Sequence, residues 1–186
     1  MRTFIAIEIP EEIKKEMVEL QRRLRSSAVD ASWPRPEGIH LTLKFLGEIP
    51  EAKVSEVQEA LKSAASRSGA FRLEVEGVGT FPHPQNARVV WIGLSGDIDK
   101  LTALQTAIED GMERIGMKRE DRPFTPHLTL GRIKYIRSKE IWLKALESLK
   151  DIRLPGFDVT AVSLMKSELK RTGAVYTEVT RAELVR

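Results

Sequence analysis

The chain has 186 residues, and its 30 basic and 27 acidic side chains give a formal charge of +3. This mild basicity permits an anionic partner but lacks the dense positive charge of a protein dedicated to duplex nucleic acid. The absence of cysteine excludes a disulfide framework, a thiolate metal site and a cysteine nucleophile. Because the first apolar stretch is short and soon meets Glu8, we expect no signal peptide, no membrane span and a cytoplasmic location.

The first half of the chain predicts the order strand, helix, strand, helix, strand. Helices are expected where apolar residues recur at helical spacing, strands where apolar and polar residues alternate, and loops where proline and glycine gather. The expected elements are a strand at residues 3–9, a helix at 11–24, a loop at 25–38, a strand from residue 40, a helix after residue 51 and a strand at 71–78.

The second half repeats this order and adds one strand. Its expected elements are a strand at 88–94, a helix at 97–115, a strand from residue 127, a short helix capped by Ser138, a strand at 157–164, a hairpin tip at 166–173 and a last strand from about residue 175. We therefore expect an α+β protein that forms a single bilobal domain, with repeat halves at roughly 1–80 and 87–186. The pattern allows one strand to cross to the other lobe.

A four-residue motif, His-Leu-Thr-Leu, occurs twice and begins at His40 and at His127. The chain has only three histidines, so two of them share one sequence context. Alternate side chains of a strand face opposite sides, so each copy presents its histidine and threonine on one face and buries its leucines on the other. If the two halves pack about an approximate two-fold axis, both imidazoles, Thr42 and Thr129 line one cleft from opposite walls.

The two motifs, with their flanks at residues 38–47 and 125–132, resemble the two-histidine phosphoesterase superfamily. The resemblance is greatest to the RNA 2′,3′-cyclic phosphodiesterase family, also called 2′-5′ RNA ligase. It covers most of the chain and includes residues 1–7 and 81–94. It implies two pseudo-symmetric lobes, each a mainly antiparallel sheet with helices on its outer face, and an active-site cleft between them. It also implies metal-independent hydrolysis of RNA 2′,3′-cyclic phosphate ends to a 2′-phosphate, with reverse 2′-5′ ligation.

The resemblance implies that His40 and His127 are the catalytic residues and that Thr42 and Thr129 contact the phosphate. It assigns His40 as the acid and His127 as the base. The chemistry of imidazole agrees, because its ordinary pKa near 6.5 lets one histidine take a proton from water while the other donates one. Neither motif carries a carboxylate at ligand spacing, and no phosphate-binding glycine loop occurs, so we expect no metal and no cofactor.

Arg132 is a further substrate-binding candidate. Strict alternation from His127 places Arg132 on the leucine face, whereas a bulge at Gly131 would turn it toward the cleft. The same alternation places Phe45 in the core rather than on a surface where a base could stack.

The expected partner is RNA with a 2′,3′-cyclic phosphate end, tRNA halves included, bound by a monomer that does not associate with membranes. The charged hairpin tip, with Lys166, Lys170 and Arg171, offers a further contact for the RNA strand. One alternative is a phosphodiesterase for small cyclic nucleotides or ADP-ribose cyclic phosphate, and another is a non-catalytic protein that binds RNA ends in the same cleft. Comparing oligonucleotide with mononucleotide substrates separates the two enzymes, and replacing either histidine separates an enzyme from a binding protein.

Overall fold

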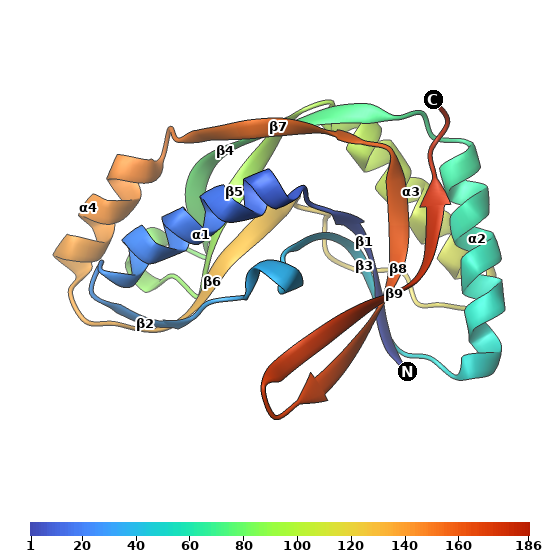
Figure 1. Ribbon diagram of the computed structural model, residues 1–186, viewed down its shortest axis with the longest axis horizontal. Coiled ribbons are helices and arrows are strands. Elements are labelled where there is room, and N and C mark those ends of the chain that lie inside the picture. The colour runs from blue at the N-terminus through green and yellow to red at the C-terminus, as the bar shows by residue number, and fades with distance from the viewer.

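A computed structural model describes all 186 residues and confirms the α+β fold class. Two antiparallel sheets, one of four strands and one of five, form two lobes with the helices on the outside (Figure 1). The strands are β1 (Arg2–Glu8), β2 (Val29–Ser32), β3 (His40–Glu48), β4 (Phe71–Phe81), β5 (Val89–Gly96), β6 (His127–Ile136), β7 (Arg153–Val159), β8 (Ala161–Lys170) and β9 (Gly173–Glu183). The helices are α1 (Glu11–Arg25), α2 (Val54–Ser66), α3 (Ile98–Arg114) and α4 (Lys139–Leu149). The strand orders are β3-β1-β8-β9 and β2-β6-β5-β4-β7.

The helices form where the sequence places apolar residues along one side. In α1, Ile13, Met17, Leu20 and Leu24 are all buried, as their spacing predicts. Pro10 stands immediately before α1, where no hydrogen bond within the helix needs its missing N–H group. None of the helices combines the length and the apolar character that crossing a membrane requires.

The two halves of the chain exchange elements. Helix α1 of the first half covers β2, β6 and β7 of the five-stranded sheet, whereas α3 of the second half packs with α2 over the four-stranded sheet (Figure 1). The last strand of the first half, β4, pairs with β5, and β8 of the second half pairs with β1. One apolar cluster of 40 buried residues joins the two lobes. The strand crossing that the sequence allows is therefore observed in both directions, and a helix of each half crosses as well.

Two strand assignments from the sequence need correction. Residues 25–38, expected as a loop, contain the four-residue strand β2, which pairs with β6 at the sheet edge. So short a strand has too few alternating positions to give a pattern. The single strand expected at 157–164 is the end of β7 and the start of β8. The two separate at Thr160, because there the chain leaves the five-stranded sheet and enters the four-stranded one.

The hairpin of β8 and β9 extends beyond the rest of its sheet, as Figure 1 shows. The expected tip at residues 166–173 is mostly paired strand, since the ladder continues to Lys170 and Gly173. Ser138 caps α4 as expected, because its Oγ accepts a hydrogen bond from the backbone N–H of Ile141 at 3.4 Å.

Candidate active site

A cavity of about 450 Å³ lies between the two sheets, whose strands β3 and β6 contact each other. His40 and Thr42 of β3 form one wall, and Thr129 and Arg132 of β6 form the other. His127 lies on the same face of β6 as Thr129 and is partly exposed, but it does not line the cavity itself. The structure therefore brings four of the five sequence candidates together and places the fifth beside them.

Both motif strands contain a bulge at the same place in the repeat. The ladder between β1 and β3 skips Leu43, and the ladder between β5 and β6 skips Leu130. Each skipped leucine directly follows the threonine of its motif. Because a bulge adds one residue to its strand, the alternation of side chains restarts after it. The third residue after each threonine therefore faces the cleft, as the threonine does.

The third residue after each threonine reaches the cavity in both repeats. Arg132 is exposed and lines it, as the predicted alternative with a bulge allows, although the skipped residue is Leu130 and not Gly131. Phe45 holds the equivalent position in the first repeat, and its side chain is 69% exposed and lines the same cavity. The assignment of Phe45 to the core is therefore wrong, because a strict alternation takes no account of the bulge at Leu43.

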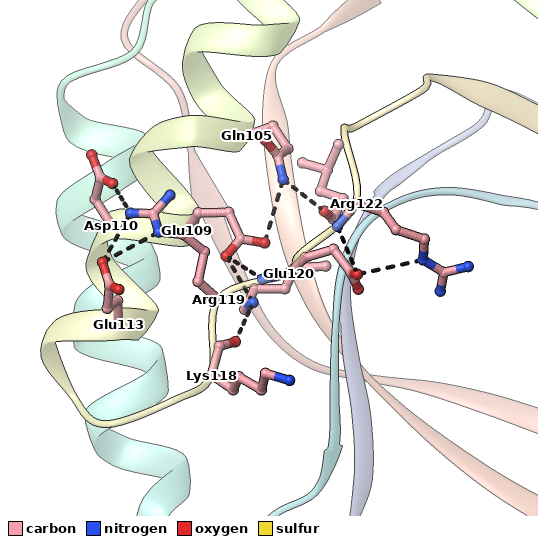
Figure 2. Close-up of polar contacts among 10 residues, drawn as sticks. Gln105, Glu109, Asp110, Glu113, Lys118, Arg119, Glu120 and Arg122 are labelled. Atoms are coloured by element: carbon pink, nitrogen blue, oxygen red, sulfur yellow. Dashed lines mark hydrogen bonds and ion pairs between the residues drawn. The ribbon is translucent and has the colours of Figure 1, made fainter.

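Lys44 and Gly131, the residues just before Phe45 and Arg132, are buried on the opposite face of their strands. A Cβ atom at Gly131 would lie 2.6 Å from Cε3 of Trp33, so a larger residue would displace the indole. Lys44 is buried, and its Nζ lies 2.8 Å from the carboxylate of Glu109 on α3. The same Nζ donates to the carbonyl of Lys118 at 2.9 Å. Figure 2 shows how the polar network around Glu109 reaches the loop that precedes the second motif.

Each histidine hydrogen-bonds to the carbonyl group two residues before it. Nδ1 of His127 lies 2.7 Å from the oxygen of Thr125, and the ring of His40 bonds to the carbonyl of Gly38. A carbonyl oxygen only accepts hydrogen bonds, so Nδ1 of His127 carries a proton. Its Nε2 is therefore the atom that remains available for proton exchange.

Aromatic rings pack around both imidazoles. The centroid of the His40 ring is 5.7 Å from that of Phe4 and 5.4 Å from that of Tyr176, both with edge-on geometry. The His127 ring is 5.1 Å from Phe81, also edge-on. Contacts of this kind restrict the orientation of an imidazole. These aromatic residues come from β1, β9 and β4, and although Phe4 and Phe81 lie in stretches that resemble the family, the sequence does not show that they pack against the histidines.

Burial lowers the pKa of His40 below its ordinary value near 6.5, because desolvation disfavours the charged ring. The positive charge of Lys14 lowers this pKa further, and the hydrogen bond to the Gly38 carbonyl raises it in part. The free protein therefore favours the neutral form of His40 near pH 7.

The charged groups that line the cavity are the guanidinium groups of Arg2 and Arg132. Because both are permanently positive, they suit an anionic ligand such as a phosphodiester. No three His, Asp or Glu side chains come close enough together to hold a metal ion.

A duplicated fold that places one histidine and one threonine on each of two facing strands defines a phosphoesterase of the two-histidine class. The profile of the family described as LigT like Phosphoesterase matches the chain twice, at residues 7–91 and 92–176. The chain belongs to this family, which confirms the resemblance that the two motifs indicate.

Relatives resemble the chain over nearly its whole length. The RNA 2′,3′-cyclic phosphodiesterase of Thermotoga maritima is 36% identical, with 95% of this chain and 91% of that protein covered. The protein of the same name from Methanocaldococcus jannaschii is 33% identical, with coverages of 95% and 96%. Among solved structures, a protein of Thermus thermophilus matches with a TM-score of 0.82 and 29% identity, covering 99% of this chain and 98% of that one. E. coli LigT complexed with 3′-AMP matches with a TM-score of 0.79 and 26% identity, with coverages of 100% and 98%.

Proposed function

We propose that the protein hydrolyses the 2′,3′-cyclic phosphate ends of RNA to a 2′-phosphate, without a metal ion. The observation that carries this proposal is the cavity between the sheets, where His40 and Thr42 face Thr129 and Arg132, with His127 beside them. The shared name of relatives that match over almost the entire chain supports the choice of substrate.

In the proposed reaction, one histidine takes a proton from water as the water oxygen bonds to phosphorus. The bond from phosphorus to O3′ breaks, and the other histidine gives a proton to O3′. Thr42 and Thr129 donate hydrogen bonds to the non-bridging oxygens, and the charge of Arg132 stabilises the anion. Each proton transfer contributes roughly 10²–10⁴ in rate. Release of the ring strain makes the cyclic ester a favourable substrate.

The resemblance assigns His40 as the acid and His127 as the base. An acid must hold its proton, and the lowered pKa of His40 opposes this in the free protein. A bound phosphodiester anion beside the ring would raise that pKa, because a nearby negative charge favours the imidazolium. The assignment therefore requires His40 to become protonated as the substrate binds.

RNA fits this cavity better than a small cyclic nucleotide does. The cavity continues from the motifs across Phe45 to Arg2 and Ser167, at the base of the β8–β9 hairpin. Phe45 offers an exposed ring for base stacking, and Arg2 offers charge for a second phosphate. Charge reversal of Lys170, on the β8–β9 hairpin, should weaken oligonucleotide binding. If it does not, the alternative substrates, small cyclic nucleotides or ADP-ribose cyclic phosphate, are favoured.

The same residues can open the cyclic phosphate with a 5′-hydroxyl in place of water, which is the proposed 2′-5′ ligation. The base histidine would deprotonate a 5′-hydroxyl in place of water, and that oxygen would open the cyclic phosphate to form a 2′-5′ bond. The strained ring supplies the free energy, so no nucleoside triphosphate is needed. Ligation is expected when two RNA ends are held together, as in a cleaved tRNA.

Both walls of the cavity come from one chain, so we further propose an enzyme that is complete as a monomer. An RNA substrate agrees with the cytoplasmic location that we propose for the enzyme. Because the halves exchange strands and helices, neither half alone completes a lobe, and we infer a single bilobal domain. Sedimentation at assay concentration checks the monomer.

The decisive assay incubates the protein with 2′,3′-cyclic-ended RNA in EDTA and identifies the position of the product phosphate. We expect a 2′-phosphate, and we expect His40→Ala and His127→Ala to bind the RNA without turning it over. Activity that EDTA abolishes and a divalent ion restores would contradict the metal-independent mechanism. RNA binding without turnover by the unaltered protein would instead show a non-catalytic RNA-end-binding protein.

A further inference from the structure

The two bulge residues, Leu43 and Leu130, have no partner residue in the strand ladders, and a side chain from a helix hydrogen-bonds to the carbonyl of each. A buried carbonyl needs a hydrogen-bond donor from elsewhere in the protein. The side chain of Gln21 on α1 supplies one, since its Nε2 donates to the carbonyl of Leu130 at 3.0 Å in a buried contact. Gln21 itself is only 3% exposed. This polar side chain on the largely apolar buried face of α1 therefore has a specific partner in the second motif.

The same amide group also reaches the first half of the cleft. Nε2 of Gln21 donates to the carbonyl of Pro34 at 2.9 Å, and Pro34 lines the cavity in the segment that leads to His40. An amide nitrogen has two hydrogens, and here both are used. One atom of Gln21 thus joins the entry to the first motif with the bulge of the second.

The second repeat contains the counterpart of this contact. Gln105 on α3 is 8% exposed, and its Nε2 donates to the carbonyl of Leu43, the bulge of the first motif, at 3.4 Å. It also contacts Glu109 at 3.5 Å (Figure 2). Each bulge is therefore held by a glutamine on the helix that the opposite half contributes. The bonds of Gln21 are the shorter ones.

We propose that Gln21 and Gln105 are positioning residues of the active site, each holding the bulge that turns a substrate-binding side chain into the cleft. Gln21 acts on Arg132, and Gln105 acts on Phe45. Without the bulge at Leu130, strict alternation would direct Arg132 to the buried face of β6, away from the cleft. The proposal rests on the proposed function for its substrate, but its geometric claim concerns an anion site alone.

The test is a double-mutant cycle of Gln21→Met and Arg132→Ala, measured on the dissociation constant for inorganic phosphate. Methionine keeps the length of the side chain and removes the donor. We expect each single variant to weaken phosphate binding about tenfold. The double variant should bind no more weakly than either single variant, because both changes remove the same contact, that of Arg132 with phosphate. A double variant whose loss equals the product of the two single losses, or an Arg132→Ala variant that binds phosphate normally, would overturn the proposal.

Three measurements keep this result unambiguous. Ser27→Ala removes another buried side-chain donor, one that bonds to Leu24 within the turn after α1, and should leave phosphate binding unchanged. If Gln21→Met does not fold, the cycle of Gln105→Met with Phe45→Ala, read on a nucleoside 2′-phosphate, decides in the same way. Turnover of cyclic-ended RNA by the unaltered protein is recorded separately, so that loss of the proposed function is not confused with failure of the positioning claim.

Discussion

The two walls of the cleft carry the same motif and bulge but differ in the two residues immediately after the bulge. On β3 these residues are Lys44 and Phe45, and on β6 they are Gly131 and Arg132. One wall therefore presents an aromatic ring and the other a guanidinium group. Both walls keep the histidine and threonine of the motif, and under the proposed function one wall suits a base and the other a phosphate.

The largest expected effect is the loss of kcat when either histidine is replaced, and an activated substrate should distinguish the acid from the base. We expect His40→Ala and His127→Ala each to lose roughly 10²–10⁴ in kcat on cyclic-ended RNA. On a 3′-deoxynucleoside 2′-(4-nitrophenyl phosphate), whose leaving group departs without a proton, His40→Ala should regain activity and His127→Ala should not. Release of nitrophenolate, followed by absorbance, gives both rates.

Recovery by His127→Ala instead would exchange the two roles. The lowered pKa of His40 would then fit its role as the base that receives the proton from water.

The buried residue after the bulge of β3, Lys44, should contribute to the stability of the fold through its ion pair. Lys44→Met leaves the Glu109 carboxylate buried without its counter-ion, which should cost roughly 3–5 kcal/mol of unfolding free energy. Replacing Glu109 by leucine in the same variant should recover most of this loss. Urea unfolding measures both, with Lys62→Met, at an exposed ion pair, as the control. An unchanged stability for Lys44→Met would show that the Lys44–Glu109 pair does not stabilise the fold.

Replacing Arg132 or Phe45 should weaken the binding of different ligands. Arg132→Ala should weaken inhibition by inorganic phosphate about 10- to 100-fold, because a charge-assisted hydrogen bond is worth roughly 1.5–3 kcal/mol. Phe45→Ala should leave phosphate unaffected and weaken a nucleoside 2′-phosphate, since base stacking is worth roughly 1–3 kcal/mol. Tyr135→Ala, at an exposed aromatic residue outside the cavity, is the control. Equal effects of Phe45→Ala on both ligands would rule out base stacking there.

The smallest effect comes from the burial of His40. Its pKa is lowered in the folded protein, so between that value and the unfolded value near 6.5 the unfolded state binds more protons. This contribution to stability is complete above pH 6.5 and is lost as the pH falls through the folded pKa. Unfolding free energies measured by urea from pH 7.5 to 5 should therefore fall less steeply in His40→Gln than in the unaltered protein or in His83→Gln. Parallel curves for all three proteins would contradict the pKa shift.

The sequence predicts the parts of the fold that follow a regular period. Buried Ile13, Met17 and Leu20 mark α1, and the two motifs mark the strands that meet at the cavity. The departures from a regular period are harder to predict, since the sequence offers a bulge in the second motif only as an alternative and gives no sign of the one in the first. The bulges at Leu43 and Leu130 shift the alternation by one residue, which is why a strict alternation places Phe45 wrongly.

Long-range contacts leave a weaker trace in the sequence. Gln21 stands four residues after Met17, on the apolar face of α1, and this polar residue in an apolar stripe is a signal that can be read. Its partner at Leu130 cannot be read, because nothing in the sequence says that α1 covers the sheet of the other half. Tyr176 likewise reaches His40 only because β9 lies in the four-stranded sheet.

The most direct test of a phosphate handled from both walls is a crystal structure with a nucleoside 2′-phosphate bound. We expect its phosphorus to lie between the imidazoles of His40 and His127, with each ring within hydrogen-bond distance of a phosphate oxygen and the base against Phe45. A phosphate that contacts only one histidine, or that binds outside the cavity between the sheets, would contradict the two-histidine mechanism.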